Sequence, residues 1–69
     1  MEATQVHEIE VHELFARLTS QFEDAAALAA EGQRAGLAPE VAARLLRDIR
    51  CIIGDSARDL AQIERRLKA

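Results

Sequence analysis

The chain has few of the residues on which small domains usually rely for stability. Its 69 residues include one cysteine, one proline and two phenylalanines, and no tryptophan or tyrosine. The single cysteine, Cys51, excludes an internal disulfide and is typical of a reducing compartment. A chain this short is marginally stable alone and usually needs a disulfide, a metal or a partner chain. We therefore expect a partner chain.

Long apolar runs are also missing. The longest uninterrupted run, residues 25–30, is far too short to cross a bilayer. Residues 1–4 lack the apolar segment of a secretory signal, so we expect a cytoplasmic protein with no membrane partner. The net charge of −3 is too mild to favour non-specific binding to nucleic acid or membranes.

The residues that are abundant predict an all-α fold. Alanine, leucine, glutamate and arginine, all good helix formers, dominate both sides of a short loop. One apolar face of the first half lies within about 40° on a helical wheel, which predicts a helix over about residues 4–33. Its members are spaced by four and three residues: Val11, Phe15, Leu18, Phe22, Ala25 and Ala29, flanked by Leu14. Val6 and Ile9 fall on the far side of this helix. Either residues 1–10 are not in phase with the rest of the helix, or Val6 and Ile9 face another chain.

A loop is predicted at residues 32–38. Gly32 or Gly36 can adopt the left-handed conformation that ends a helix, and Leu37 suits the apolar contact that follows. Pro39 fits the first turn of a new helix because its missing N–H costs nothing there. Glu40 suits the positive end of that helix dipole.

The second half carries one apolar stripe that crosses Gly54 without losing phase. With Leu45 as reference, the other members lie between roughly −40° and 60° on the wheel. They are Val41, Ile49, Ile52, Ser56, Leu60, Ile63 and Leu67. Gly54 points to the polar side, so we expect one continuous helix over about residues 39–67, with Gly54 costing about 1 kcal/mol relative to alanine. A kink at Gly54 is the alternative.

Two helices of similar length joined by one short loop predict an antiparallel hairpin, one domain over residues 1–69. Residues 1–33 carry a net charge of −6 and residues 34–69 a net charge of +3, so the halves attract. Two helices cannot cover both apolar stripes, so we expect the hairpin to complete a four-helix bundle as a homodimer, or to dock a helix of another protein. The predicted seam consists of Val11, Phe15, Leu18, Phe22, Leu45, Ile49, Ile52, Leu60 and Ile63.

A basic face on the second helix supports a rival function. Its members are Arg44, Arg47, Arg58 and Arg65. Such a face is one footprint of nucleic-acid binding. The interleaved carboxylates Asp48, Asp55 and Asp59 and the absence of aromatic residues from this half favour a solvated, salt-bridged face instead.

Candidate chemistry is sparse. His7, Glu8, His12 and Glu13 invite a metal site, but zinc needs at least three ligands at fixed spacing and the two histidines do not share a helix face. Cys51 has arginines nearby but no placed base that would make it a nucleophile. No phosphate loop or serine triad is present, and a thin hairpin offers little concave volume. We therefore expect no enzyme activity, no cofactor, no metal and no small-molecule substrate.

The run Leu14-Phe15-Ala16-Arg17-Leu18, followed by Gly32 and Pro39-Glu40, is similar in order to the small co-chaperones of type III secretion needle subunits. Dimeric plasmid copy-number regulators are acidic hairpins of comparable size. These generic features cover about half the chain and identify no family. The resemblance implies an adaptor or co-chaperone that wraps a partner helix. The leading expectation is thus a small protein-protein interaction module, and the alternative is a nucleic-acid-binding regulator.

Overall fold

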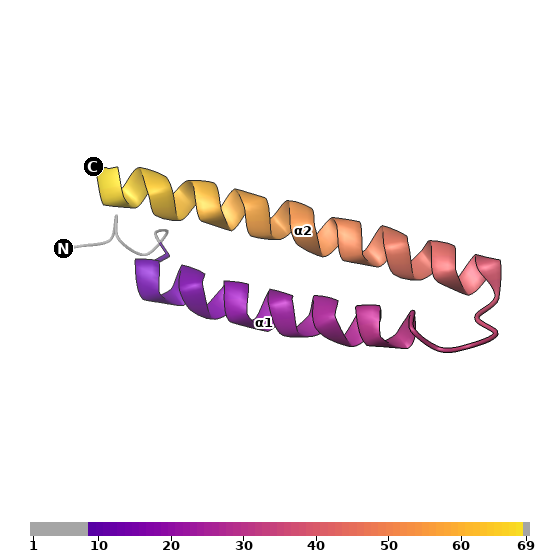
Figure 1. Ribbon diagram of the computed structural model, residues 1–69. Coiled ribbons are helices and arrows are strands. Elements are labelled where there is room, and N and C mark those ends of the chain that lie inside the picture. Colours follow the sequence, from indigo (N-terminus) through magenta and orange to yellow (C-terminus); the bar gives the residue numbers. More distant parts are fainter. Residues whose placement is uncertain (1–8, 69) are drawn as a thin grey trace.

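The protein forms an antiparallel pair of helices joined by one loop (Figure 1). The structure is a computed structural model that describes residues 9–68. Helix α1 spans Val11–Glu31, with 21 residues, and helix α2 spans Pro39–Lys68, with 30 residues. The prediction of an all-α, two-helix hairpin is confirmed, whereas its assembly into a four-helix bundle stays a prediction.

Helix α2 continues through Gly54, as the unbroken phase of its apolar stripe predicted. A Cβ atom built on Gly54 meets nothing within 4 Å, so no close packing requires a glycine there. The apolar stripe on both sides of Gly54 holds the helix together because its burial outweighs the backbone entropy that one glycine costs.

The loop between the helices contains the expected turn chemistry. Helix α1 ends at Glu31, where the backbone N–H of Gly32 donates to the carbonyl of Leu28 at 3.2 Å. Gly36 has a φ of 75°, the left-handed region that costs a side-chain-bearing residue about 1–2 kcal/mol. Helix α2 then opens at Pro39, and the N–H of Ala42 closes its first turn on the carbonyl of Ala38 at 3.0 Å.

The predicted start of the first helix needs a correction. Helix α1 begins at Val11, and Glu10 is its N-cap with extended backbone (ψ 154°), so residues 9–10 are not helical. The Glu13 carboxylate accepts a hydrogen bond from the Glu10 N–H at 3.3 Å, which replaces a partner that a longer helix would have supplied. Residues 4–8, including Val6, lie outside the described residues.

Ile9 explains why the helix stops there. In a continuing helix its side chain would point away from α2, at roughly 160° from Val11 on the wheel. Outside the helix, Ile9 packs instead against the core formed by Leu14, Leu18 and Ile63. The Arg66 guanidinium also donates a hydrogen bond to the Ile9 carbonyl and ties this segment to the end of α2.

The contact between the helices follows a seven-residue repeat, the pattern of antiparallel coiled coils. We call this set the hairpin seam; all its members are buried or half-buried. It comprises Leu14, Leu18, Gln21, Ala25 and Leu28 on α1, and Leu45, Ile49, Ile52, Ser56, Asp59 and Ile63 on α2.

Four residues of the predicted seam are not part of the hairpin seam: Val11, Phe15, Phe22 and Leu60. Phe15, Phe22 and Leu60 are about half exposed in the single chain, whereas Leu14, predicted only to flank the stripe, is fully buried. Within the hairpin, Leu14 and Gln21 therefore face α2, one position before Phe15 and Phe22. The assignment of Phe15, Phe22 and Leu60 to a seam between chains stays a prediction. Among the other predicted members, Leu18, Leu45 and Ile63 are buried, and Val11, Ile49 and Ile52 are half-buried.

Candidate interaction surface

A polar cluster lies inside the hairpin seam, about midway along α1. The Arg17 Nη2 atom lies 3.1 Å from Asp59 Oδ1, and Gln21 Nε2 donates to Asp59 Oδ2 at 3.0 Å. The Ser56 hydroxyl donates to Gln21 Oε1 at 2.7 Å. Both carboxylate oxygens of Asp59 are thus paired, although its side chain is only 2% exposed.

This cluster fixes how the helices pair. A buried carboxylate is tolerated only when charge and hydrogen bonds compensate for its lost hydration. Sliding one helix by a turn would separate Asp59 from Arg17 and Gln21 and leave that charge unpaired. We therefore assign the polar cluster the role of setting the register, a role for which a single buried polar residue suffices in coiled coils.

Sequence reasoning missed Asp59 as an interior residue. It was assigned to the polar face of the second helix, yet on the same wheel it lies about 40° from Leu45, at the edge of the apolar stripe. Ser56 also lies on that stripe, and this polar residue at an apolar position indicated a polar contact in the interior. The additional signal was Arg17, the one basic residue of the otherwise acidic α1.

Six large apolar side chains remain exposed on the outside of the hairpin, each between 50% and 70% accessible. Their positions repeat every seven residues on each helix. We call them the heptad stripe: Phe15 and Phe22 on α1, and Leu46, Ile53, Leu60 and Leu67 on α2. Scattered exposed apolar residues are normal on a monomer, but a continuous repeat is the mark of a helix that contacts a further neighbour.

Both parts of the heptad stripe lie on one side of the hairpin. Each member except Leu67 follows a residue of the hairpin seam by one position, a rotation of about 100°. Because both helices are right-handed and run in opposite directions (Figure 1), this rotation turns their side chains towards the same side. The Arg17–Asp59 and Gln21–Ser56 contacts bring Phe15 near the level of Leu60.

A hollow near the loop lies on the same side. It is lined from both helices by Leu28 and Ala29 on α1 and by Ala42, Leu45, Leu46 and Ile49 on α2, together with the loop residues Gly32, Gln33 and Leu37. Ala29 follows Phe22 by seven residues, so it occupies the next position of the repeat with a small side chain. The hollow therefore extends the heptad stripe towards the loop, and a side chain from another helix can fill it.

The predicted arginine face lies on the outer surface of α2. Arg44, Arg47, Arg58 and Arg65 are all exposed. Arg58 is paired with Asp55 on the same helix, and Lys68 lies 3.3 Å from Glu64. Such exposed pairs contribute little to stability but neutralise part of the basic charge.

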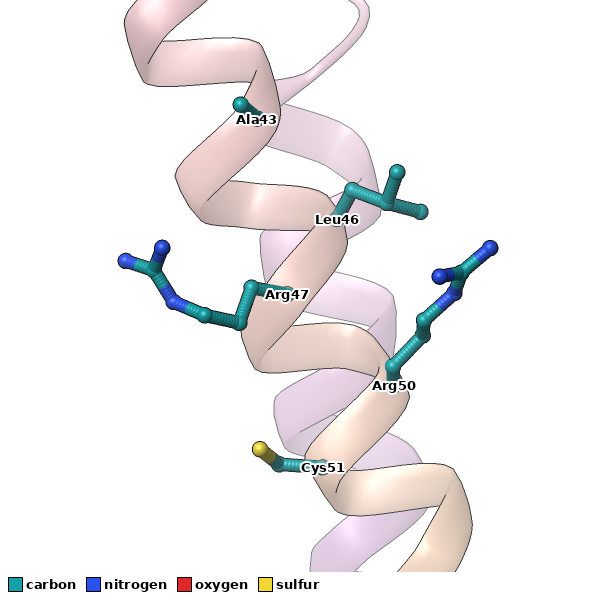
Figure 2. A pocket seen from close by; sticks show the side chains of 5 residues that line it. All are labelled: Ala43, Leu46, Arg47, Arg50 and Cys51. Atoms are coloured by element: carbon teal, nitrogen blue, oxygen red, sulfur yellow. The ribbon is translucent and has the colours of Figure 1, made fainter.

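A second hollow lies on this outer surface and is lined by residues of α2 alone (Figure 2). Figure 2 shows Leu46 and Arg50 projecting to one side, with Arg47 and Cys51 on the other, so the side chains do not converge on a common point. Catalytic sites and small-molecule sites need converging groups in a concave pocket. The side chains around this hollow lack that convergence.

Neither candidate metal ligands nor a membrane span is found in the described part of the chain. No three histidine, cysteine, aspartate or glutamate side chains among residues 9–68 gather closely enough to hold a metal ion. His12 and Glu13 are exposed, and His7 and Glu8 lie outside the described residues. Cys51 is an exposed free thiol. Neither α1 nor α2 has a stretch apolar enough to cross a bilayer.

Comparison with known proteins gives no family assignment. No family model matches the chain, and no curated protein or solved structure matches it. The function is therefore argued from the heptad stripe and its surroundings.

Proposed function

We propose that the protein is a non-enzymatic protein-protein interaction module that binds helical surfaces through its heptad stripe. The observation that carries this proposal is the seven-residue repeat of the exposed side chains, aligned on one side of two antiparallel helices. In a bundle, a helix touches two neighbours and needs apolar residues at three of every seven positions. The hairpin seam uses two of those positions, and the heptad stripe supplies the third.

The apolar area that the heptad stripe exposes supports the same proposal. Half the surface of six large side chains amounts to about 600 Å², if each presents roughly 200 Å² when fully exposed. This equals the largest apolar patches of ordinary monomers, about 300–600 Å², and approaches the roughly 800 Å² per partner of a specific interface. Covering it would supply stability that a chain of 69 residues lacks.

The test is a charged substitution inside the heptad stripe with a matched control outside it. Ile53→Glu places a carboxylate in the middle of the stripe, and Ala61→Glu places one on the exposed outer face of the same helix. We expect Ile53→Glu to weaken association by on the order of 100-fold or more, because burying an unpaired charge is costly. Ala61→Glu should associate like the wild type.

Light scattering and circular dichroism on the three purified chains check this prediction. Helicity that is lost in Ile53→Glu and kept in Ala61→Glu supports a role of the stripe in association. If all three chains are folded monomers of equal helicity and equal thermal stability, the heptad stripe takes no part in association and the proposal is wrong.

The rival function, nucleic-acid regulation through Arg44, Arg47, Arg58 and Arg65, rests on exposure and charge alone. It differs in its response to salt, because phosphate contacts weaken steeply as salt rises whereas apolar docking does not. Association that weakens only slightly between about 50 and 500 mM salt, and is lost in Ile53→Glu, favours the heptad stripe.

A further inference from the structure

The heptad stripe runs along a hairpin whose two helices carry opposite net charge. Helix α1 contains four carboxylates and one arginine, and α2 contains seven basic residues and five carboxylates. A second copy of the hairpin can cover the stripe in two ways. Either each α1 lies against α2 of the second copy, with both loops at one end, or like helices pair and the loops lie at opposite ends.

Resting on the proposed function, we propose that the occupant of the heptad stripe is a second copy of this chain, with both loops at the same end. The two-fold axis then runs parallel to the helices. Each negatively charged α1 lies against a positively charged α2, both within a hairpin and between hairpins. Pairing like helices would instead place net charges of the same sign against each other.

The residues bordering the stripe show the same complementarity. Glu23 follows Phe22 on the outer side of α1, and Arg50 lies beside Leu46 on α2, projecting to the same side (Figure 2). Both are exposed. With the two-fold axis parallel to the helices, residues of the second copy lie at the same height as in the first. The observed Gln21–Ser56 contact then places Glu23 within about one helical turn of Arg50 of the second copy.

The arrangement also stacks the stripe into layers. Phe15 and Leu60 share one level, and Phe22 and Ile53 share the next, as the contacts of Arg17 and Gln21 with α2 require. A second copy in this orientation adds the same pair to each level, so each of these two layers holds four large apolar side chains. The last layer contains Ala29 and Leu46, where Leu46 of the second copy can fill the hollow near the loop.

The distance between the two loops tests this inference on the full chain. Arg34 is exposed in the loop, and Arg34→Cys in a Cys51→Ala background provides one attachment point for a spin label. With the loops at the same end, the two labels lie about 10–30 Å apart, since neighbouring helix axes are about 8–10 Å apart. With the loops at opposite ends, they lie about 45 Å or more apart, the length of α2 at about 1.5 Å per residue.

Each outcome of the pulsed electron-spin distance measurement is decisive. A short distance that disappears when Ile53→Glu is added supports the inference. A long distance that also needs Ile53 overturns the orientation but leaves the interaction module intact. Absence of any distance, with a poorly helical monomer, overturns the second copy as occupant and leaves a different helical protein. A well-folded monomer overturns both this inference and the proposed function.

Charge reversal gives an independent check. Glu23→Arg or Arg50→Glu alone should raise the dissociation constant of the pair several-fold, because each places like charges together. The double variant should restore association to near the wild-type value. Rescue fails if like helices pair, because Glu23 then faces α1 of the second copy and Arg50 faces its α2, so the two reversed charges do not meet.

Discussion

The two ends of the hairpin are built differently. At the end formed by the start of α1 and the end of α2, which we call the terminal end, Leu14, Leu18 and Ile63 form a buried core, and the polar cluster around Asp59 adjoins it. Near the loop, α1 is rich in alanine over residues 25–30, Leu45 is the buried side chain, and a hollow opens between the helices. Most of the buried contact between the two helices therefore lies at the terminal end.

This difference shows what each end is suited to do. Large residues and a paired charge specify one register at the terminal end. Small residues near the loop give up packing energy within the hairpin but let another helix approach closely. A surface that is loosely packed alone and lined by apolar groups is what a bundle needs where its hairpins meet.

The largest expected effect is at the terminal end. Leu14→Ala removes a fully buried side chain and should lower the free energy of unfolding by about 3 kcal/mol. Leu28→Ala, the same change at a half-buried position near the loop, should cost about 1 kcal/mol. Urea denaturation at one fixed chain concentration measures both. Equal losses would contradict the contrast between the ends.

The polar cluster should come next. Asp59→Ala leaves Gln21 and the half-exposed Arg17 without their acceptor inside the seam, and we expect a loss of about 2 kcal/mol in unfolding free energy. Asp55→Ala is the matched control, because Asp55 is an exposed aspartate paired with an arginine on the same helix. It should change stability by less than about 0.5 kcal/mol. If the two variants unfold alike, Asp59 does not fix the register.

The smallest effects are expected at two glycines and have opposite signs. Gly54→Ala should raise stability by about 1 kcal/mol, because the helix has room for a methyl group there. Gly36→Ala should lower it by about 1 kcal/mol, because the loop holds this residue at a φ of 75°. Thermal melting at constant chain concentration measures both. A destabilising Gly54→Ala would mean that the outer face of α2 packs against another chain at that point.

The hairpin was predictable because its signals are strong and local. The apolar stripe of the second half keeps its phase across Gly54, and Gly36 with Pro39 marks a turn followed by a helix start. The start of α1 was harder to predict, because Ile9 gives up helical geometry to reach a core that includes Ile63 at the far end of the sequence. A contact of that kind is set by tertiary packing rather than by local propensity.

The face that α1 turns towards α2 was not predictable from hydrophobicity. Two series with heptad spacing overlap in this helix, one through Leu14 and Gln21 and the other, one residue later, through Phe15 and Phe22. Ranking by hydrophobicity selects the phenylalanines. The structure selects the first series within the hairpin, because Gln21 and Arg17 satisfy the buried Asp59. The phenylalanines thereby remain on the exposed side, where they carry the proposed interaction.

The most direct test of that interaction is the mass of the wild-type chain in solution across a dilution series, recorded together with its helicity. We predict a mass near twice the chain mass of 7.6 kDa at high concentration, falling on dilution together with helicity. A mass of one chain at every concentration, with full helicity throughout, would show that the hairpin is stable with its heptad stripe uncovered and would contradict the account.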